Sequence, residues 1–190
     1  AIAFYLVWAG AAWNFAAGDA ITSIAGSATG IRIDSSTGVT IDGAKSGGGK
    51  LALPALSCGI YAIIGNTNLT IKNFDVSGAG LGNGLQVASP NLIIDSIVAN
   101  DRGTGVLVQS SSNPKVSNIS ATRNVFGLQL NSSTFTTPPN AATLAGLDLQ
   151  NNSFGLYMDT VSMGTGCTVA TCPFAIGPSR FVAGTPLASS

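Results

Sequence analysis

Residues 92–130 read LIIDSIVANDRGTGVLVQSSSNPKVSNISATRNVFGLQL, and this stretch carries the pattern that decides the fold. It contains the unit glycine–apolar–any–apolar twice, at Gly105-Val106-Leu107-Val108 and Gly127-Leu128-Gln129-Leu130. In both cases an apolar residue stands 8 positions before the glycine, at Ile97 and Ile119. Alternating apolar residues are typical of short strands with one buried face. The stretch therefore predicts a repeated unit built from strands.

The same unit extends in both directions from this stretch and occurs six times in all. Its glycines follow one another at intervals of 29, 25, 21, 22 and 28 residues, and a short apolar run such as Leu92-Ile93-Ile94 precedes most of them. One such coil cannot bury its apolar side chains alone, so coils must stack about 4.8 Å apart around a shared core. We therefore predict an all-β parallel β-solenoid of about six coils. The repeat glycines are Gly30, Gly59, Gly84, Gly105, Gly127 and Gly155.

A family resemblance supports this prediction. The stretch Gly18-Asp19-Ala20-Ile21, followed by residues 35–43 (SSTGVTIDG), resembles the entry to right-handed parallel β-helix proteins of the pectate-lyase-like and NosD-like kind. The resemblance covers roughly residues 18 to 160 and implies a right-handed parallel β-helix. Its motifs identify a fold and leave function open. We expect an apolar N-terminal segment at 1–20 and a β-helix domain at 21–190.

The composition excludes several function classes. The 190 residues contain 8 Lys and Arg and 8 acidic residues, and every acidic residue is Asp because Glu is absent; His is also absent. Nucleic acid is not an expected partner, because phosphate binding needs clustered Lys and Arg. No imidazole is present to act as a base or a metal ligand. We expect no metal and no cofactor.

Aligning the coils predicts which side chains stack. We expect an ion-pair column and an aromatic pair, because opposite charges and aromatic rings in adjacent strands attract. We also expect a polar column that ends in asparagines and a column of hydroxyls. In that order the columns are Asp42, Lys72 and Asp95; Phe126 and Phe154; Arg102, Asn124 and Asn152; and Ser89, Ser110, Ser132 and Thr160.

The catalytic candidates are weak. Asp95, Asp101, Arg102 and Arg123 are the one group of acidic and basic residues worth naming, and the alignment places Asp101 beside Arg123. The resemblance to pectate lyases implies an Arg base with calcium held by carboxylates. We favour the structural interpretation, in which the same residues form a ladder of ion pairs. The chain has no His, no Glu and no Asp-Asp pair. We therefore expect a binding or structural protein rather than an enzyme.

The N-terminal segment is the most apolar part of the chain. It is interrupted at Asn14, and 17 residues up to Ala17 are marginal for a bilayer span, so we expect no membrane insertion. It either caps the core of its own domain or inserts into a neighbouring copy. The residues assigned to such assembly are Ile2, Phe4, Tyr5, Leu6, Val7, Trp8, Trp13 and Phe15.

The composition is typical of an extracellular protein, which favours a disulfide, whereas sequons can also arise by composition in an Asn- and Ser-rich solenoid. Cys167 and Cys172 enclose a four-residue loop and form either a disulfide or two separate buried thiols, whereas Cys58 is expected in the core. Four sequons offer glycosylation sites if the protein is secreted. Their asparagines are Asn68, Asn118, Asn131 and Asn151.

These observations predict a secreted or cell-surface structural protein. In the leading hypothesis, copies of the β-helix bind head to tail into a filament or surface layer through the N-terminal segment. One alternative is a carbohydrate-binding or adhesion module. In that case Tyr61 and Tyr157, at the middle positions of their strands, face outward and stack on sugar rings. The other alternative is a polysaccharide lyase of the pectate-lyase-like type.

Overall fold

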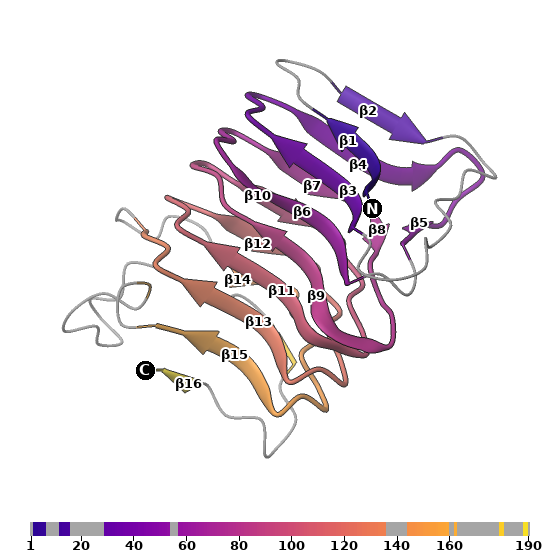
Figure 1. The fold of residues 1–190 in the computed structure, drawn as a ribbon. Coiled ribbons are helices and arrows are strands. Elements are labelled where there is room, and N and C mark those ends of the chain that lie inside the picture. The colour runs from indigo at the N-terminus through magenta and orange to yellow at the C-terminus, as the bar shows by residue number, and fades with distance from the viewer. Residues whose placement is uncertain are drawn as a thin grey trace.

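The computed structural model describes residues 29–53, 57–135, 144–159, 162 and 179–180 in full, together with the backbone of three terminal strands. The regular elements in this part of the chain are short strands, and Figure 1 shows them stacked as successive coils. The terminal strands are β1 (Ile2–Leu6), β2 (Ala12–Phe15) and β16 (Ala188–Ser189).

The first face of the solenoid is an eight-stranded parallel sheet in the order β1-β3-β6-β9-β11-β13-β15-β16. Each of its six inner strands carries one of the repeat glycines, so the predicted repeat is confirmed. The inner strands are β3 (Thr29–Asp34), β6 (Cys58–Ile64), β9 (Gly80–Val87), β11 (Arg102–Gln109), β13 (Phe126–Asn131) and β15 (Phe154–Met158).

The second face is a six-stranded sheet in the order β14-β12-β10-β7-β4-β2. The third face begins with the pair β5 and β8 and continues as single bridges from Asp75 through Val98, Ser120 and Asp148 to Arg180. The strands of these two faces are β4 (Thr40–Lys45), β5 (Leu51–Ala52), β7 (Thr70–Lys72), β8 (Phe74–Asp75), β10 (Ile93–Asp95), β12 (Lys115–Ser117) and β14 (Leu144–Ala145).

The core lies between the three faces and is built of apolar columns. In the eight-stranded sheet the first apolar residue of each repeat pairs with its counterpart in the next coil, and none is exposed. Burying each side chain of this size contributes about 1.5–3 kcal/mol relative to exposure. Stacking is therefore what stabilises each short strand. This column is Ile31, Ile60, Leu85, Val106, Leu128 and Leu156.

The corner between the second and third faces has a residue with positive φ in four successive coils. Asn73, Ser96, Asn118 and Gly146 have φ between 54° and 61°. A left-handed residue turns the chain sharply between two strands, and Asn and Gly adopt that conformation at the least cost. The Asn- and Ser-rich segments between the apolar runs are thus the turns of the solenoid.

Two polar ladders run inside the solenoid along its turns. The Arg102 N–H donates to Asn124 Oδ1 (2.7 Å) and the Asn124 N–H donates to Asn152 Oδ1 (2.7 Å), which confirms the predicted column. The predicted hydroxyl column is confirmed at Ser89 and is wrong by one residue in the next two coils. Ser110 and Ser132 have positive φ and are exposed, so the next serines turn inward instead, and Thr160 lies outside the described residues. The observed ladder is Ser89, Ser111, Ser133 and Ser162.

The N-terminal segment adds strands to its own solenoid. In β1, Phe4 pairs with Ile31 of β3, and in β2, Trp13 pairs with Ile41 of β4. Both strands lie at one end of the stack in Figure 1, and β16 lies at the other end. Of the assembly residues, Val7 and Trp8 fall outside the described part, and insertion of the segment into a neighbouring copy stays a prediction.

Candidate functional site

Two of the predicted catalytic residues form an ion pair between adjacent coils. Arg123 donates from Nε and Nη2 to the two carboxylate oxygens of Asp101, both at 2.7 Å. The side chains are 56% and 46% exposed, and exposed pairs of this kind contribute little to stability. The hydrogen bonds from Arg123 hold the pKa of Asp101 below its ordinary value. The pair matches the predicted ladder.

The third candidate, Arg102, is committed to the interior. It is 3% exposed, and its guanidinium donates to the main-chain carbonyls of Val76 (2.8 Å), Ser77 (3.2 Å) and Leu53 (3.3 Å). Burial lowers its pKa from the ordinary value. Arg102 therefore ties turns of neighbouring coils together from the interior.

The fourth candidate, Asp95, belongs to a separate network at the end of β10. It accepts hydrogen bonds from Ser117 Oγ (2.6 Å), Asn118 Nδ2 (2.8 Å) and Ser96 Oγ (3.0 Å). Burial alone would raise the pKa of Asp95, but these hydrogen bonds outweigh burial and lower it. A general acid in glycoside cleavage needs the opposite shift.

The predicted column of Asp42, Lys72 and Asp95 is present in the register of the second face. Lys72 Nζ lies 3.1 Å from Asp42 Oδ2. The four catalytic candidates thus divide into an ion pair, an internal clamp and a hydrogen-bonded carboxylate. These four residues therefore do not place two carboxyl groups on either side of a glycosidic bond, as glycoside hydrolysis requires.

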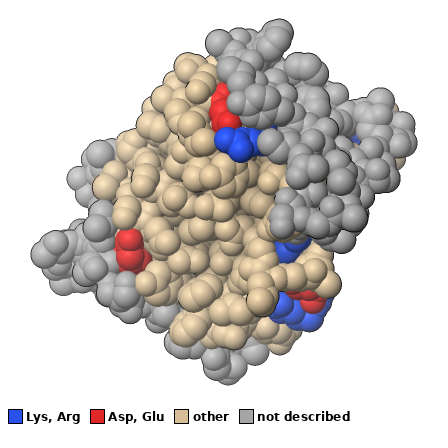
Figure 2. Space-filling model, in the orientation of Figure 1, with Lys and Arg blue, Asp and Glu red and all other residues tan. Residues whose placement is uncertain are grey.

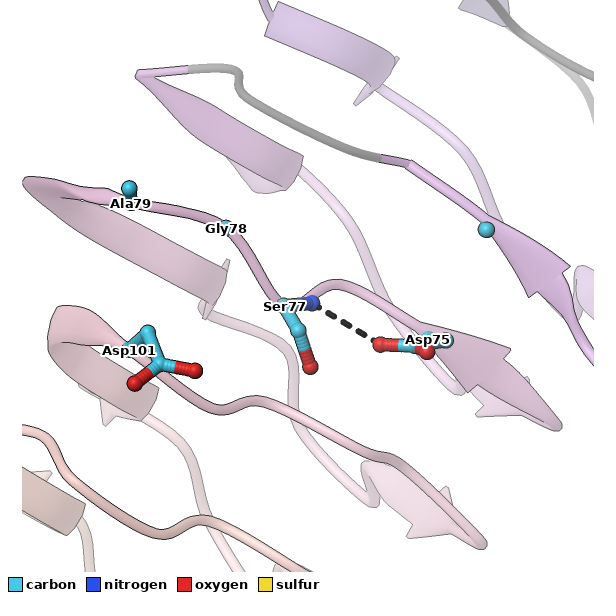
Figure 3. Close-up of a pocket in the computed structure, with 6 residues that line it drawn as sticks. Asp75, Ser77, Gly78, Ala79 and Asp101 are labelled. Carbon is cyan, nitrogen blue, oxygen red and sulfur yellow. Dashed lines mark hydrogen bonds between the residues drawn. The ribbon is translucent and has the colours of Figure 1, made fainter.

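A hollow of about 370 Å³ opens beside the third face, next to Asp101. Figure 3 shows Asp75 and Ser77 on one coil and Asp101 on the next, with the Ser77 N–H donating to Asp75 Oδ1 (3.0 Å). Among the residues the structure describes, no three acidic or cysteine side chains gather as a metal site would require. Asp75 and Ser77 were not among the predicted site residues; the sequence signal for them is that they follow the buried Phe74 by one and three positions.

The outer surface of the eight-stranded sheet carries a different arrangement, which we call the outer face. It is the row formed by the middle residues of the six repeats, which pair in register from coil to coil and are all half-buried. Aromatic and amide side chains dominate this row. Its members are Arg32, Tyr61, Gln86, Leu107, Gln129 and Tyr157.

Hydrogen bonds between amides hold the centre of the outer face. Gln86 accepts at Oε1 from Asn83 Nδ2 (2.8 Å) and donates from Nε2 to Gln109 Oε1 (2.8 Å). In a later coil, Gln129 Nε2 donates to Asn131 Oδ1 (3.2 Å). These bonds fix the orientation of planar groups that both donate and accept hydrogen bonds.

Aromatic side chains lie at both ends of the outer face. At one end Phe126 stacks on Phe154 with ring centroids 5.1 Å apart, as predicted, and meets Tyr157 edge-on at 5.5 Å. At the other end the Arg32 guanidinium lies 5.5 Å from the ring centroid of Tyr61. Phe154 is 36% exposed, so the aromatic groups remain accessible to a ligand.

Charge is scarce on this surface. Figure 2 views the molecule from the side of the eight-stranded sheet, and the described surface is almost entirely uncharged, with acidic and basic groups near its margins. The charged residues within the six inner strands are Arg32, Asp34 and Arg102. Arg32 Nε bonds Asp34 Oδ2 at 2.8 Å, and Arg102 is buried. The outer face therefore offers rings and amides without net charge.

The cysteines and sequons have a limited structural context. Cys58 is a free, buried thiol, and burial raises its pKa to about 12. Cys167 and Cys172 lie outside the described residues, so their disulfide stays a prediction. Among the sequon residues, Asn68, Asn118 and Asn151 are exposed and have positive φ. Asn131 is half-buried, and the Ser133 hydroxyl of its sequon is fully buried.

Comparison with known proteins identifies the fold family. The model of the right-handed β-helix region matches residues 19–154, which is well over half of the chain. No curated protein and no solved structure matches the chain. Within the described residues, no helix has the length and apolar character needed to cross a membrane. The parallel three-faced architecture and this match agree, and the chain belongs to the right-handed parallel β-helix family.

Proposed function

We propose that this protein is a carbohydrate-binding module that holds uncharged polysaccharides on its outer face. The observation that carries the proposal is the row of half-buried side chains across six coils, in which tyrosines and glutamines predominate and the one charged member, Arg32, is paired with Asp34. Sugar rings present apolar C–H faces and a rim of hydroxyls. Aromatic rings stack on the apolar C–H faces, and amides donate hydrogen bonds to the sugar hydroxyls and accept hydrogen bonds from them.

Charge supports an uncharged ligand over an acidic one. An acidic polysaccharide would gain from unpaired Lys or Arg on the binding surface. On the outer face Arg32 is already paired with Asp34. The lyase alternative receives no support, because Arg102 is buried against carbonyls and Arg123 is paired with Asp101. We place the module outside the cell or at its surface, where such polymers occur.

The proposal is tested by co-sedimentation of the protein with insoluble cellulose, chitin and mannan, with an assay for new reducing ends on the same samples. Binding to at least one polymer without product formation is the expected result. Phe154→Ala removes part of the aromatic cluster and is expected to weaken binding. Ile93→Ala is the matched control, because Ile93 is 39% exposed but belongs to the second face. Equal losses in both variants, or no binding at all, would refute the proposal.

Head-to-tail self-association remains a second candidate function. The observation that favours it is that β1 and β16 are the outermost strands of the eight-stranded sheet, so each has one edge without a strand partner within the described part of the chain. Exposed sheet edges pair readily with further strands. Electron microscopy and light scattering at low micromolar concentration test it, and a monodisperse monomer would contradict it. A chain lacking residues 1–17 should assemble less well if β1 and β2 form the contact.

A further inference from the structure

We propose that the outer face binds its glycan at two separated aromatic positions, so that the ligand is a linear chain of about five or more sugars lying across the strands. This inference rests on the proposed function and adds to it the length and direction of the ligand. The first position is Tyr61 with Arg32 beside it. The second is the cluster of Phe126, Phe154 and Tyr157.

The register of the sheet fixes the distance between the two positions. Tyr61 pairs with Gln86, and the row continues through Leu107 and Gln129 to Tyr157. These are four strand-to-strand steps of about 4.8 Å, so the two tyrosines are separated by about 19 Å along the solenoid axis.

The centre of the row differs chemically from its ends. Gln86, Leu107 and Gln129 contain no ring on which a sugar can stack. The amides of Gln86 and Gln129 are oriented by their bonds to Gln109 and Asn131, and they face the hydroxyl edges of a ligand that crosses them. Stacking is thus concentrated at the ends, and hydrogen bonding is concentrated between them.

Ligand length follows from this spacing. An extended glycan advances by roughly one strand spacing per sugar, about 5 Å, so a trisaccharide reaches one aromatic position and a hexasaccharide reaches both. When a single chain occupies both positions, the second contact forms at a high effective concentration and strengthens binding without any new residue. Affinity should therefore rise steeply with chain length between three and six sugars.

Calorimetric titration with the trioses and hexaoses of the cello, chito and manno series tests the inference on the full chain. For at least one series we expect the hexaose to bind about tenfold or more tightly than the triose. Tyr61→Ala should remove most of that advantage while leaving a triose site at the Phe126 cluster, whereas Ile93→Ala should leave both affinities unchanged. Thermal unfolding of each variant verifies that it is folded.

The outcomes separate the inference from the function on which it rests. A triose and a hexaose bound equally tightly would overturn the two-position geometry and leave carbohydrate binding intact. A length advantage that survives Tyr61→Ala would also overturn the geometry, because Tyr61 would then not be the distant contact. Absence of binding to every hexaose and to all three insoluble polymers would overturn the proposed function and this inference with it.

Discussion

Replacing Asn124 with alanine tests how much the internal asparagine ladder stabilises the solenoid. Asn124 is 5% exposed; its Oδ1 accepts from the Arg102 N–H (2.7 Å), and its Nδ2 donates to the Ala99 carbonyl (3.0 Å). Alanine leaves both of these main-chain groups buried without that partner. An unsatisfied buried group costs about 1–3 kcal/mol, so the two together lower the free energy of unfolding by about 2–6 kcal/mol.

Urea unfolding followed by far-ultraviolet circular dichroism measures this loss. With a slope of about 3 kcal/mol per molar urea, the midpoint of the Asn124→Ala variant should fall by about 0.7–2 M. Gln129→Ala is the control, because it removes an amide that is half-buried on the outer face and should change the free energy by no more than about 0.5 kcal/mol. Equal effects of the two changes would refute the argument, since burial of the unpaired groups would then carry no cost.

Three further predictions concern packing and titration. Gly105→Ala should destabilise the fold by about 1–3 kcal/mol in the same urea assay, because a Cβ there would lie 2.7 Å from the Gly127 carbonyl oxygen. Gly80→Ala is the control and should leave the free energy of unfolding unchanged, because the space around Gly80 is open. The pKa of Asp95 is lowered in the folded protein, so its stabilising contribution is present above about pH 4 and is lost as the pH falls through the folded-state pKa. The Asp95→Asn variant should therefore show a flatter dependence of unfolding free energy on pH in this range. An unchanged dependence would contradict the lowered pKa of Asp95. Cys58, whose pKa is raised to about 12, should react with iodoacetamide at pH 8 only after unfolding, and peptide mapping that finds it modified in the folded protein would contradict its burial.

The fold was predictable because one physical requirement repeats in every coil. Each coil must present apolar residues to the coils above and below it, so Val106 and Leu128 recur at the same place relative to their glycines and pair in the structure. The glycines have a packing reason, since a Cβ at Gly105 or Gly127 would collide with the carbonyl of the next coil. A steric limit and an apolar alternation are both visible in a single sequence.

The register of the turns was less predictable because it depends on φ. The sequence places several serines in a row after β11, and nothing in their identity tells which one turns inward. Ser110 adopts a φ of 49° and is exposed, so Ser111 takes the inward position and joins the ladder. Any hydroxyl column read from spacing alone is therefore uncertain by one residue.

The candidate site was predicted only in part. A sequence gives the chemical type of each residue, whereas the fold decides which side chains point to the same surface. Asp101 and Arg102 are neighbours in the chain, yet the Asp101 side chain is exposed and paired with Arg123, whereas the Arg102 side chain is buried against main-chain carbonyls. The repeat did predict that the side chains of Tyr61 and Tyr157, at the middle positions of their strands, face outward. Gln86 and Gln129 occupy the same position, but an amide in a strand gives no signal until its neighbours are known.

The two proposed activities use different parts of the solenoid and are compatible for a geometric reason. The outer face runs along the side of the stack, whereas β1 and β16 lie at its ends, so a ligand on the side would leave the ends open for pairing (Figure 1). If copies paired end to end in register, the row of middle residues would continue from one copy into the next. A long glycan would then contact several copies at once, and its apparent affinity would rise with assembly. Polysaccharide binding that strengthens with protein concentration, while hexaose binding does not, would distinguish this coupled arrangement from two independent activities.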